Sequence, residues 1–340
     1  MRKSLFFGAG KSLFQATENA GKWTITEHET SQELQCLAVD PEAGRLYAGT
    51  FDDGLWLSDD QGKTWQKGGE GIHHDRVLSV AVSPVEKNHG YGVVWAGTEP
   101  SALFRSEDGG RNWTELPSLL ELPSEPSWSF PPRPHTHHVR YIQPDIHAEN
   151  RIYVGIELGG VMKSEDRGET WEDRKEGSQF DCHTLTMNQL ARDRVYEAGG
   201  GGFAESLDGG NTWKTRNDGL GPYTYLVEMA VDAGDPDTII VSGARGPGSA
   251  YDPARASTVL FRREKNHDWE LITDGLPDPE GSTVLTLASD ENIPGHFYAV
   301  NNTGLYQSVD SGKSWSRLPL SWPRHVMKER VRFLILDQTH

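Results

Sequence analysis

Short runs of apolar, aromatic and β-branched residues recur along the chain and are separated by Gly, Pro and Asp. One series consists of residues 37–39, 45–49 and 55–58, with an Asp-Pro pair and an Asp-Asp-Gly segment between the runs. Runs of this length and composition, bounded by turn residues, indicate antiparallel strands joined by tight turns. The hydrophobic pattern therefore predicts an all-β protein.

An eight-residue motif follows the third strand of each series, and its clearest copy is Ser58-Asp59-Asp60-Gln61-Gly62-Lys63-Thr64-Trp65. The motif occurs seven times, and two of the copies, which end at Trp23 and Trp269, are degenerate. The tryptophans that end the copies are Trp23, Trp65, Trp113, Trp171, Trp213, Trp269 and Trp315. They are separated by 42, 48, 58, 42, 56 and 46 residues. Self-similarity at this period is typical of propellers and solenoids, and four strands in about 40–50 residues fit one propeller blade.

The two ends of the chain complement each other. Residues 4–10, 12–17 and 23–27 supply three strands without an inner strand, and residues 331–336 supply one strand without a partner. Pairing them would close the ring and remove exposed sheet edges. The sequence predicts one seven-bladed β-propeller domain over residues 1–340, closed by the N-terminal strands and the C-terminal strand.

The repeated motif resembles the Asp box, or BNR repeat, of sialidases, xyloglucanases, sortilin-type receptors and photosystem II assembly factors. The resemblance implies a propeller in which the box is a structural turn remote from the active site. The box aspartates are therefore interpreted as structural rather than catalytic. They are Asp60, Asp108, Asp166, Asp208 and Asp310.

The resemblance also implies a glycosyl-hydrolase-like protein, but the family members differ in function. Sialidases have six blades and an Arg-Ile-Pro motif, whereas this chain has seven units and lacks that motif. Xyloglucanase-like enzymes use two rings, and photosystem assembly factors are single non-catalytic rings. Fold alone does not decide among these functions.

Two long insertions mark one face of the predicted ring. Residues 117–134 lie between two blades, and residues 245–257 lie between the second and third strands of a blade. Both belong to the face opposite the Asp boxes. Insertions on one face of a repeat protein usually mark its binding face.

The candidate site lies beside the first insertion. Aligning the blades by their turns places His138 and His183 at equivalent inner-strand positions, and Glu99 and Glu157 at equivalent loop positions. These four residues and His137 are the five catalytic candidates. The substrate-binding candidates are Arg140, Arg245, Arg330, Tyr225, Trp128 and Phe130.

Three interpretations of this cluster remain open. Glu157 or Glu99 could act as a base with the histidines as acids or oxyanion stabilisers, as paired carboxylates do in glycosidases. Alternatively, His138, His183 and Glu157 could bind a divalent metal ion with an open coordination position. In the third interpretation, the polar side chains only line a water-filled channel.

Composition restricts the partners and the compartment. The formal charge of −17 argues against nucleic acid or an anionic membrane surface as partner. No run of 18 apolar residues is present. Cys36 and Cys182 fall in inner strands of different blades, so we expect free thiols and a cytoplasmic location.

The sequence therefore favours an enzyme of the hydrolase or lyase type, acting on a small polar or carbohydrate-like molecule at the face opposite the Asp boxes. The alternative is a non-catalytic scaffold that presents the same face to a protein partner. No cofactor is specified, apart from the possible divalent metal ion.

Overall fold

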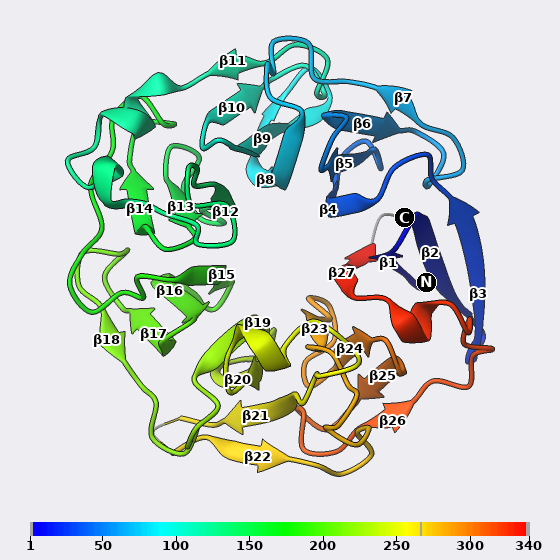
Figure 1. Ribbon diagram of the computed structural model, residues 1–340. Helices are drawn as coiled ribbons and strands as arrows, with labels where there is room; N and C mark the ends of the chain where they lie inside the picture. The colour runs from blue at the N-terminus through cyan, green and yellow to red at the C-terminus, as the bar shows by residue number, and fades with distance from the viewer. Residues whose placement is uncertain (1–2, 266, 338–340) are drawn as a thin grey trace.

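Seven β-sheets surround a central axis in the computed structural model, which describes residues 3–265 and 267–337 (Figure 1). The predicted seven-bladed all-β propeller is thus confirmed, whereas the predicted domain limits, residues 1 and 340, lie outside the described residues. The strands nearest the axis are β27 (Val331–Asp337), β4 (Leu34–Val39), β8 (Arg76–Asn88), β12 (Val139–Pro144), β15 (Cys182–Asn188), β19 (Tyr225–Asp232) and β23 (Thr286–Ser289). Each of them contacts the inner strand of the next blade.

The other strands follow outward in chain order. The second strands are β1 (Lys3–Ala9), β5 (Leu46–Thr50), β9 (Tyr91–Glu99), β13 (Ile152–Ile156), β16 (Ala191–Gly199), β20 (Asp235–Ala244) and β24 (Phe297–Asn301). The third strands are β2 (Ser12–Asn19), β6 (Leu55–Ser58), β10 (Leu103–Ser106), β14 (Gly160–Ser164), β17 (Gly202–Ser206), β21 (Val259–Arg263) and β25 (Gly304–Ser308). The outer strands are β3 (Lys22–Glu29), β7 (Gln66–Lys67), β11 (Thr114–Glu115), β18 (Lys214–Thr215), β22 (Glu270–Ile272) and β26 (Ser316–Arg317).

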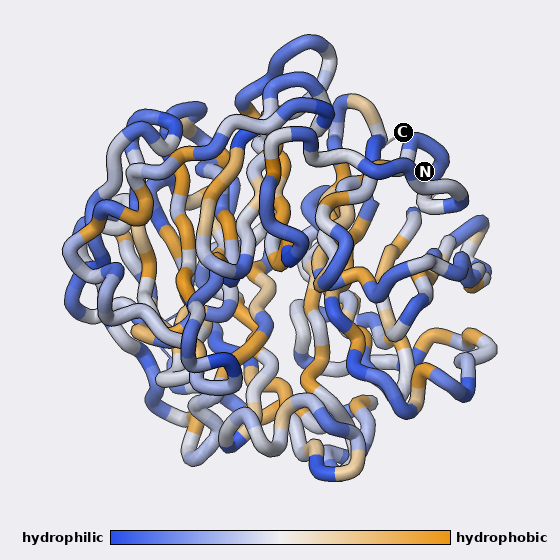
Figure 2. The backbone as a smooth tube through the Cα atoms, turned by 45° about the horizontal axis from the view of Figure 1, so that its top comes forward, coloured by the Kyte–Doolittle hydropathy of each residue, from blue (hydrophilic) through white to orange (hydrophobic). Residues whose placement is uncertain are grey.

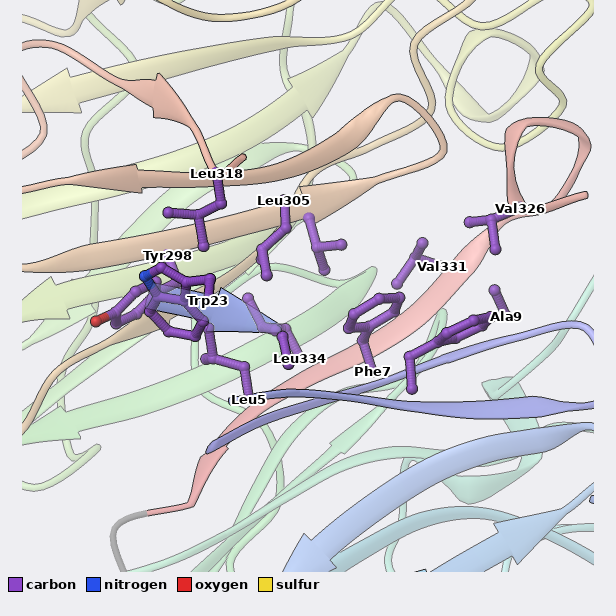
Figure 3. Packing of buried hydrophobic residues seen from close by; sticks show 13 residues of the cluster. Leu5, Phe7, Ala9, Trp23, Tyr298, Leu305, Leu318, Val326, Val331 and Leu334 are labelled. Carbon is purple, nitrogen blue, oxygen red and sulfur yellow. The ribbon is translucent and has the colours of Figure 1, made fainter. Parts of the chain in front are cut away.

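The closing blade combines both ends of the described chain, as predicted. Strand β27 pairs antiparallel with β1, so that Leu5 lies opposite Leu336. Figure 3 shows the apolar cluster at this closure, where Leu5 and Phe7 of β1 lie among Val331 and Leu334 of β27 and side chains of the preceding blade. Burying such side chains contributes roughly 1.5–3 kcal/mol each, so the closure is a substantial hydrophobic interface.

An aromatic side chain recurs at one position of the second strand and fills the space between blades. Tyr47, Trp95, Tyr153, Tyr196 and Tyr298 occupy this position and are almost completely buried. Apolar residues concentrate along the strands, whereas the connecting loops are mostly hydrophilic (Figure 2). The core is therefore distributed around the ring.

The Asp-box turn is held by its own side chains. In the clearest copy, Asp60 Oδ1 accepts hydrogen bonds from Ser58 Oγ and the Thr64 N–H, both at 2.9 Å, and Asp60 Oδ2 accepts one from Thr64 Oγ1 at 2.7 Å. Gly62 has φ of 82°, a backbone conformation that glycine adopts without strain. Equivalent carboxylate contacts recur at Asp108, Asp166, Asp208 and Asp310.

The blades are counted from the one that begins with β4, and the third of them departs from the predicted four strands. Its sheet contains β12, β13 and β14, and only a single bridge joins Lys163 to Glu172 where an outer strand is expected. The residues that follow hold the long insertion instead. Asp173 accepts a hydrogen bond from the Ser124 N–H at 2.9 Å, and Arg174 donates to Ser127 Oγ at 3.1 Å. The residues at the outer-strand position thus contact the insertion through their side chains.

The helical segments are single 3₁₀ turns. They are η1 (Pro117–Glu121), η2 (Glu125–Ser127), η3 (Pro247–Ser249) and η4 (Val326–Lys328). In the described part of the chain, no helix has the length and apolar character needed to cross a membrane.

Replacing Asp60 with Ala should lower the free energy of unfolding by about 1 kcal/mol, because three hydrogen bonds of a partly exposed turn are lost. Hydrogen bonds from Thr64 and Ser58 lower the pKa of Asp60 from 3.8 to about 2. Its stabilisation is therefore present above pH 3.8 and is lost as the pH falls through about 2. Urea unfolding at pH 7 and pH 2 measures both effects. The exposed Asp52→Ala is the control, and equal stability of the two variants at pH 7 would contradict the role of the turn.

Candidate functional site

The candidate site lies where the inner strands begin, at the end of the ring that we call the entry rim. Near this end, β12, β15 and β19 each contain a bulge, in which two residues of the inner strand face one residue of its neighbour. The bulged residues are Arg140, His183 and Val227, because the flanking residues keep their partners. A bulge releases a residue from the ladder and re-aims its side chain, which frees Arg140 and His183 for contacts outside the sheet.

This register corrects one sequence alignment. Arg140, not His138, is the equivalent of His183, because the inner strand of the third blade continues to Pro144, beyond the turn position assumed from the sequence. The equivalence of Glu99 and Glu157 is correct. Gly97 pairs with Ser79 and Gly155 pairs with Tyr141, and each glutamate follows two residues after its glycine.

His138 lies between the two glutamates. Its Nε2 is 3.0 Å from Glu157 Oε2, and its Nδ1 is 3.7 Å from Glu99 Oε2. The imidazole is buried, and the edge-on ring of Phe130 covers it at a centroid distance of 4.8 Å. His138 is therefore placed to join two carboxylates from neighbouring blades rather than to contact a ligand directly.

Glu99 is held in a cluster of arginines. Its carboxylate, which has no exposed surface, accepts hydrogen bonds from Arg133 to both oxygens and one from Arg76 at 2.9 Å. Burial alone would raise the pKa of Glu99, but Arg133, His138 and Arg76 together lower it. Glu99 thus ties the insertion containing Arg133 to the second blade, and its oxygens are already occupied.

Glu157 is reachable from solvent and remains ionised. Its side chain is 16% exposed, and Arg140 Nε lies 3.6 Å from Oε2. Burial opposes ionisation, but the His138 hydrogen bond and the charge of Arg140 outweigh it and lower the pKa of Glu157 to about 2. At neutral pH this residue is a carboxylate that can bind a cation or orient a hydroxyl group.

His183 and Asp181 meet Glu157 at the next blade. One ligand atom from each of the three residues lies within 4.8 Å of the others. His183 Nδ1 contacts the Leu226 carbonyl oxygen at 2.6 Å, and its Nε2 faces Asp181 Oδ1 at 3.4 Å. Of the predicted metal ligands, His183 and Glu157 belong to this group. Asp181 completes it, whereas His138 contacts Glu157 from outside it.

Glu228 is not among the predicted catalytic residues. It follows the bulge of β19, where burial raises its pKa to about 7, while Arg140, Arg330 and His183 act in the opposite direction. An acidic side chain within an otherwise apolar inner strand, Tyr225–Ala230, is the sequence signal that could have identified it. Its protonation changes near neutral pH, which suits an acid or base.

The second insertion supplies Tyr251 to the same rim. The Tyr251 hydroxyl lies 3.0 Å from that of Tyr225, and the Tyr225 ring meets His183 edge-on at 4.8 Å. On the other side, the Arg330 guanidinium stacks over the Tyr251 ring at 3.8 Å. Burial lowers the pKa of Arg330 to about 10, so it remains a cation at neutral pH. The structure thus places Tyr225 against His183 and links Arg330 to this pair through Tyr251.

Three further candidates lie apart from these groups. Trp128 is buried in the core of the third blade, and its indole N–H donates to Ser124 Oγ at 2.9 Å. His137 contacts Ser101 Oγ at 2.8 Å and packs edge-on against Trp128. Arg245 is exposed and stacks over Tyr223. Their contacts are with Ser101, Tyr223 and two residues of the first insertion, Ser124 and Glu125, rather than with Glu99 or Glu157.

A separate cavity of 180 Å³ lies between the fourth and fifth blades. Its wall contains Glu205, which pairs with Arg194 at 2.7 Å and with Arg263 at 3.2 Å. Ligand pockets usually measure about 300–1,000 Å³, so this ion-paired space is small for a ligand.

Comparison with known proteins identifies the repeat. The family model described as BNR/Asp-box repeat matches residues 56–67. The chain is a BNR-repeat β-propeller. It is 25% identical over 157 residues to the photosystem II assembly lipoprotein Ycf48 of Synechococcus sp. (strain CC9902), a match that covers 46% of this chain and 41% of Ycf48.

Solved structures share the fold of this BNR-repeat propeller. An ancestral GH74 enzyme superposes with a TM-score of 0.64 at 16% identity, over 90% of this chain and 38% of that one. YCF48 bound to D1 peptide gives a TM-score of 0.60 at 16% identity, over 92% of this chain and 95% of that one. The match thus spans less than half of the Ycf48 lipoprotein and of the GH74 enzyme.

Glu99→Gln should lower the free energy of unfolding by about 2–3 kcal/mol, because two arginines lose a buried charged partner. Thermal unfolding measures the effect. Glu121→Gln, an exposed position of the same insertion, should leave the melting temperature unchanged. A Glu99→Gln protein as stable as the Glu121→Gln protein would show that the arginine cluster does not hold the insertion.

Proposed function

We propose that this protein is an enzyme of the hydrolase or lyase type, acting at the entry rim on a small polar or carbohydrate-like molecule. The observation that carries the proposal is a pair of carboxyl groups with opposite environments. The pKa of Glu157 is lowered to about 2, whereas burial raises that of Glu228 to about 7, and both interact with Arg140. Groups whose pKa values are driven apart in one site are suited to separate acid and base roles.

The two carboxyl groups have distinct roles in this proposal. Glu228 is partly protonated at neutral pH and donates a proton to the leaving group. Glu157 is ionised and orients the attacking water or the substrate hydroxyl, while His138 fixes its position through the 3.0 Å contact. Such a division between two carboxyl groups is the chemistry of glycoside hydrolysis.

Arginines and tyrosines would hold the substrate. The Nε atoms of Arg140 and Arg330 are buried and have no hydrogen-bond partner within the described residues, so both can donate to an anionic or hydroxyl oxygen. The Arg140 side chain is 24% exposed, which leaves it accessible. Tyr251 covers the site from the second insertion and offers a ring face. A sugar acid or a comparable polar anion fits this set of donors.

The comparison with the GH74 enzyme supports an enzymatic function only as an analogy of fold, at 16% identity. The predicted glycan ligand therefore belongs to the proposal, as does the cytoplasmic location suggested by the two cysteines. The entry rim contains acidic residues near its arginines, and the net charge is −17, so nucleic acid remains an unsuitable partner.

Glu228→Gln should reduce turnover by about 10²–10⁴-fold, because a proton donor is removed. In the native protein, turnover should fall as the pH rises through about 7, when Glu228 loses its proton. Hydrolysis of a panel of aryl glycosides and glycuronides, followed from pH 5 to 9, measures both effects.

The melting temperature of Glu228→Gln shows whether lost turnover reflects lost catalysis or lost folding. The raised pKa of Glu228 stabilises the fold below its ordinary value of 4.5, and this contribution is lost as the pH rises through about 7. Glu228→Gln should therefore leave the melting temperature intact at pH 4, where the carboxyl group is largely protonated in both states, and remove this loss at pH 8. Glu329→Gln, an exposed glutamate beside Arg330, is the activity control. Unchanged turnover in Glu228→Gln would reject the proposed acid.

A peptide-binding scaffold is the second candidate. The YCF48 chain bound to D1 peptide matches this ring over nearly its whole length, which favours a binding function for a ring of this size. The two functions predict different effects of the same substitutions. In a scaffold, Arg140→Gln would weaken binding in a peptide-array assay, whereas Glu228→Gln would have no effect.

A further inference from the structure

Three potential metal ligands from two blades converge at the entry rim. Glu157 follows β13, Asp181 precedes β15, and His183 is the bulged residue of β15. One oxygen of each carboxylate and one imidazole nitrogen lie within 4.8 Å of one another. We propose that this group binds a divalent transition-metal ion of the zinc or manganese class.

The protonation of His183 supports a cation at this position. Its Nδ1 must donate a proton to the Leu226 carbonyl oxygen, because a carbonyl can only accept and the two atoms are 2.6 Å apart. In the neutral ring, Nε2 then carries a lone pair, yet it faces Asp181 Oδ1, another acceptor, at 3.4 Å. Both atoms are buried and lack a hydrogen-bond partner. A metal ion between them would satisfy both acceptors at once.

The carbonyl contact is also the usual support of a metal-binding histidine. Histidine ligands commonly donate their second ring N–H to a carbonyl or carboxylate, which fixes the tautomer and the ring orientation. Here the side chain of His183 is only 1% exposed, and the Tyr225 ring packs against it. The imidazole is therefore held with Nε2 directed at the carboxylates.

A run of four glycines, Gly199–Gly202, makes room for Asp181. A Cβ atom on Gly200 would lie 2.0 Å from Asp181 Oδ2, a distance that atoms cannot adopt. The Gly200 N–H also donates to the Asp181 carbonyl oxygen at 2.8 Å. Beside it, buried Glu197 accepts a hydrogen bond from the Gln179 N–H at 2.8 Å. The backbone thus fixes the position of the Asp181 carboxylate, although the Asp181 side chain is 21% exposed.

The charge and chemistry of the site fit a divalent transition metal. Two carboxylates and one neutral imidazole balance two positive charges, and a mixed N and O donor set suits zinc or manganese better than magnesium, which prefers oxygen and water. Arg140 and His138 contact Glu157 and limit its excess negative charge. The partial exposure of both carboxylates leaves access for a further ligand.

The metal site includes Glu157, the ionised carboxylate of the proposed function, and its catalytic meaning rests on that function. Metal binding itself rests only on the contacts described here. A bound metal would supply a polarised water or substrate oxygen next to Glu228.

Isothermal titration of untagged, chelator-treated protein with Zn²⁺, Mn²⁺ and Mg²⁺ tests the inference. We expect one Zn²⁺ or Mn²⁺ per chain and a rise in melting temperature on binding. Asp181→Asn, which retains the shape of the side chain, should abolish binding or weaken it by more than 100-fold. Gly200→Ala, which changes no ligand, should weaken binding by about 10–100-fold through displacement of Asp181.

Gly248→Ala in the second insertion is the matched control, because its added methyl group meets no atom within 4 Å. Its metal affinity should equal that of the native protein. Absence of Zn²⁺ and Mn²⁺ binding in the native protein, or equal affinity in the native and Asp181→Asn proteins, would overturn the inference.

Activity assays distinguish the two proposals. Metal binding that depends on Asp181, without turnover of any substrate, would support the metal site and reject the enzymatic function. Turnover that depends on Glu228, in a protein that binds no metal and is unaffected by chelator, would have the opposite meaning. It would support the enzymatic function and reject the metal site.

Discussion

The pairing of β1 with β27 is the constraint on which the rest of the ring depends. Each blade packs against two neighbours, so the position of every blade is fixed only when the last interface forms. Strand pairing and the apolar cluster around Phe7 and Leu334 supply this interface. The entry rim collects residues from the third, fourth and closing blades, and the contact between Tyr251 and Arg330 spans the fifth blade and the closing blade. The site geometry therefore depends on closure of the whole ring.

The polar cluster around Glu99 and the group of Glu157, Asp181 and His183 differ in how many of their hydrogen-bonding atoms remain unpaired. Glu99 uses both oxygens on arginines and joins an insertion to the ring. Glu157 and Asp181 remain partly exposed, and the acceptor atom of His183 faces them without a donor. An ion cluster that completes its own contacts supports the fold, whereas incomplete contacts at an accessible rim favour a ligand.

The sequence predicted the architecture well because its markers are local. The repeated tryptophans and the Asp-box turn are determined by residues close in the chain, and they identify seven blades before any long-range contact is known. Glu99 and Glu157 were aligned correctly because Gly97 and Gly155 mark the same strand position. His138 was aligned two residues away from its true register, because the turn was placed at Gln143 whereas β12 continues to Pro144.

The remaining parts of the site depend on contacts between distant residues. Asp181 lies two residues before the bulge, at the position that His138 occupies in the third blade, and its place is set by the backbone at Gly200. The raised pKa of Glu228 results from burial, which the sequence of β19 only suggests. The third blade likewise lacks an outer strand within the described residues, and Asp173 beside it contacts the first insertion, a pairing that no local pattern indicates.

The bulge in the inner strand has a consequence for how such a ring can diversify. Its residue makes no ladder pair, so its side chain can change while the hydrogen bonds of the sheet persist. Five blades carry five different side chains there, namely Gln35, Leu78, Arg140, His183 and Val227. Mutation can therefore explore new chemistry at one backbone position per blade without remodelling the scaffold, and neighbouring blades can acquire complementary groups independently.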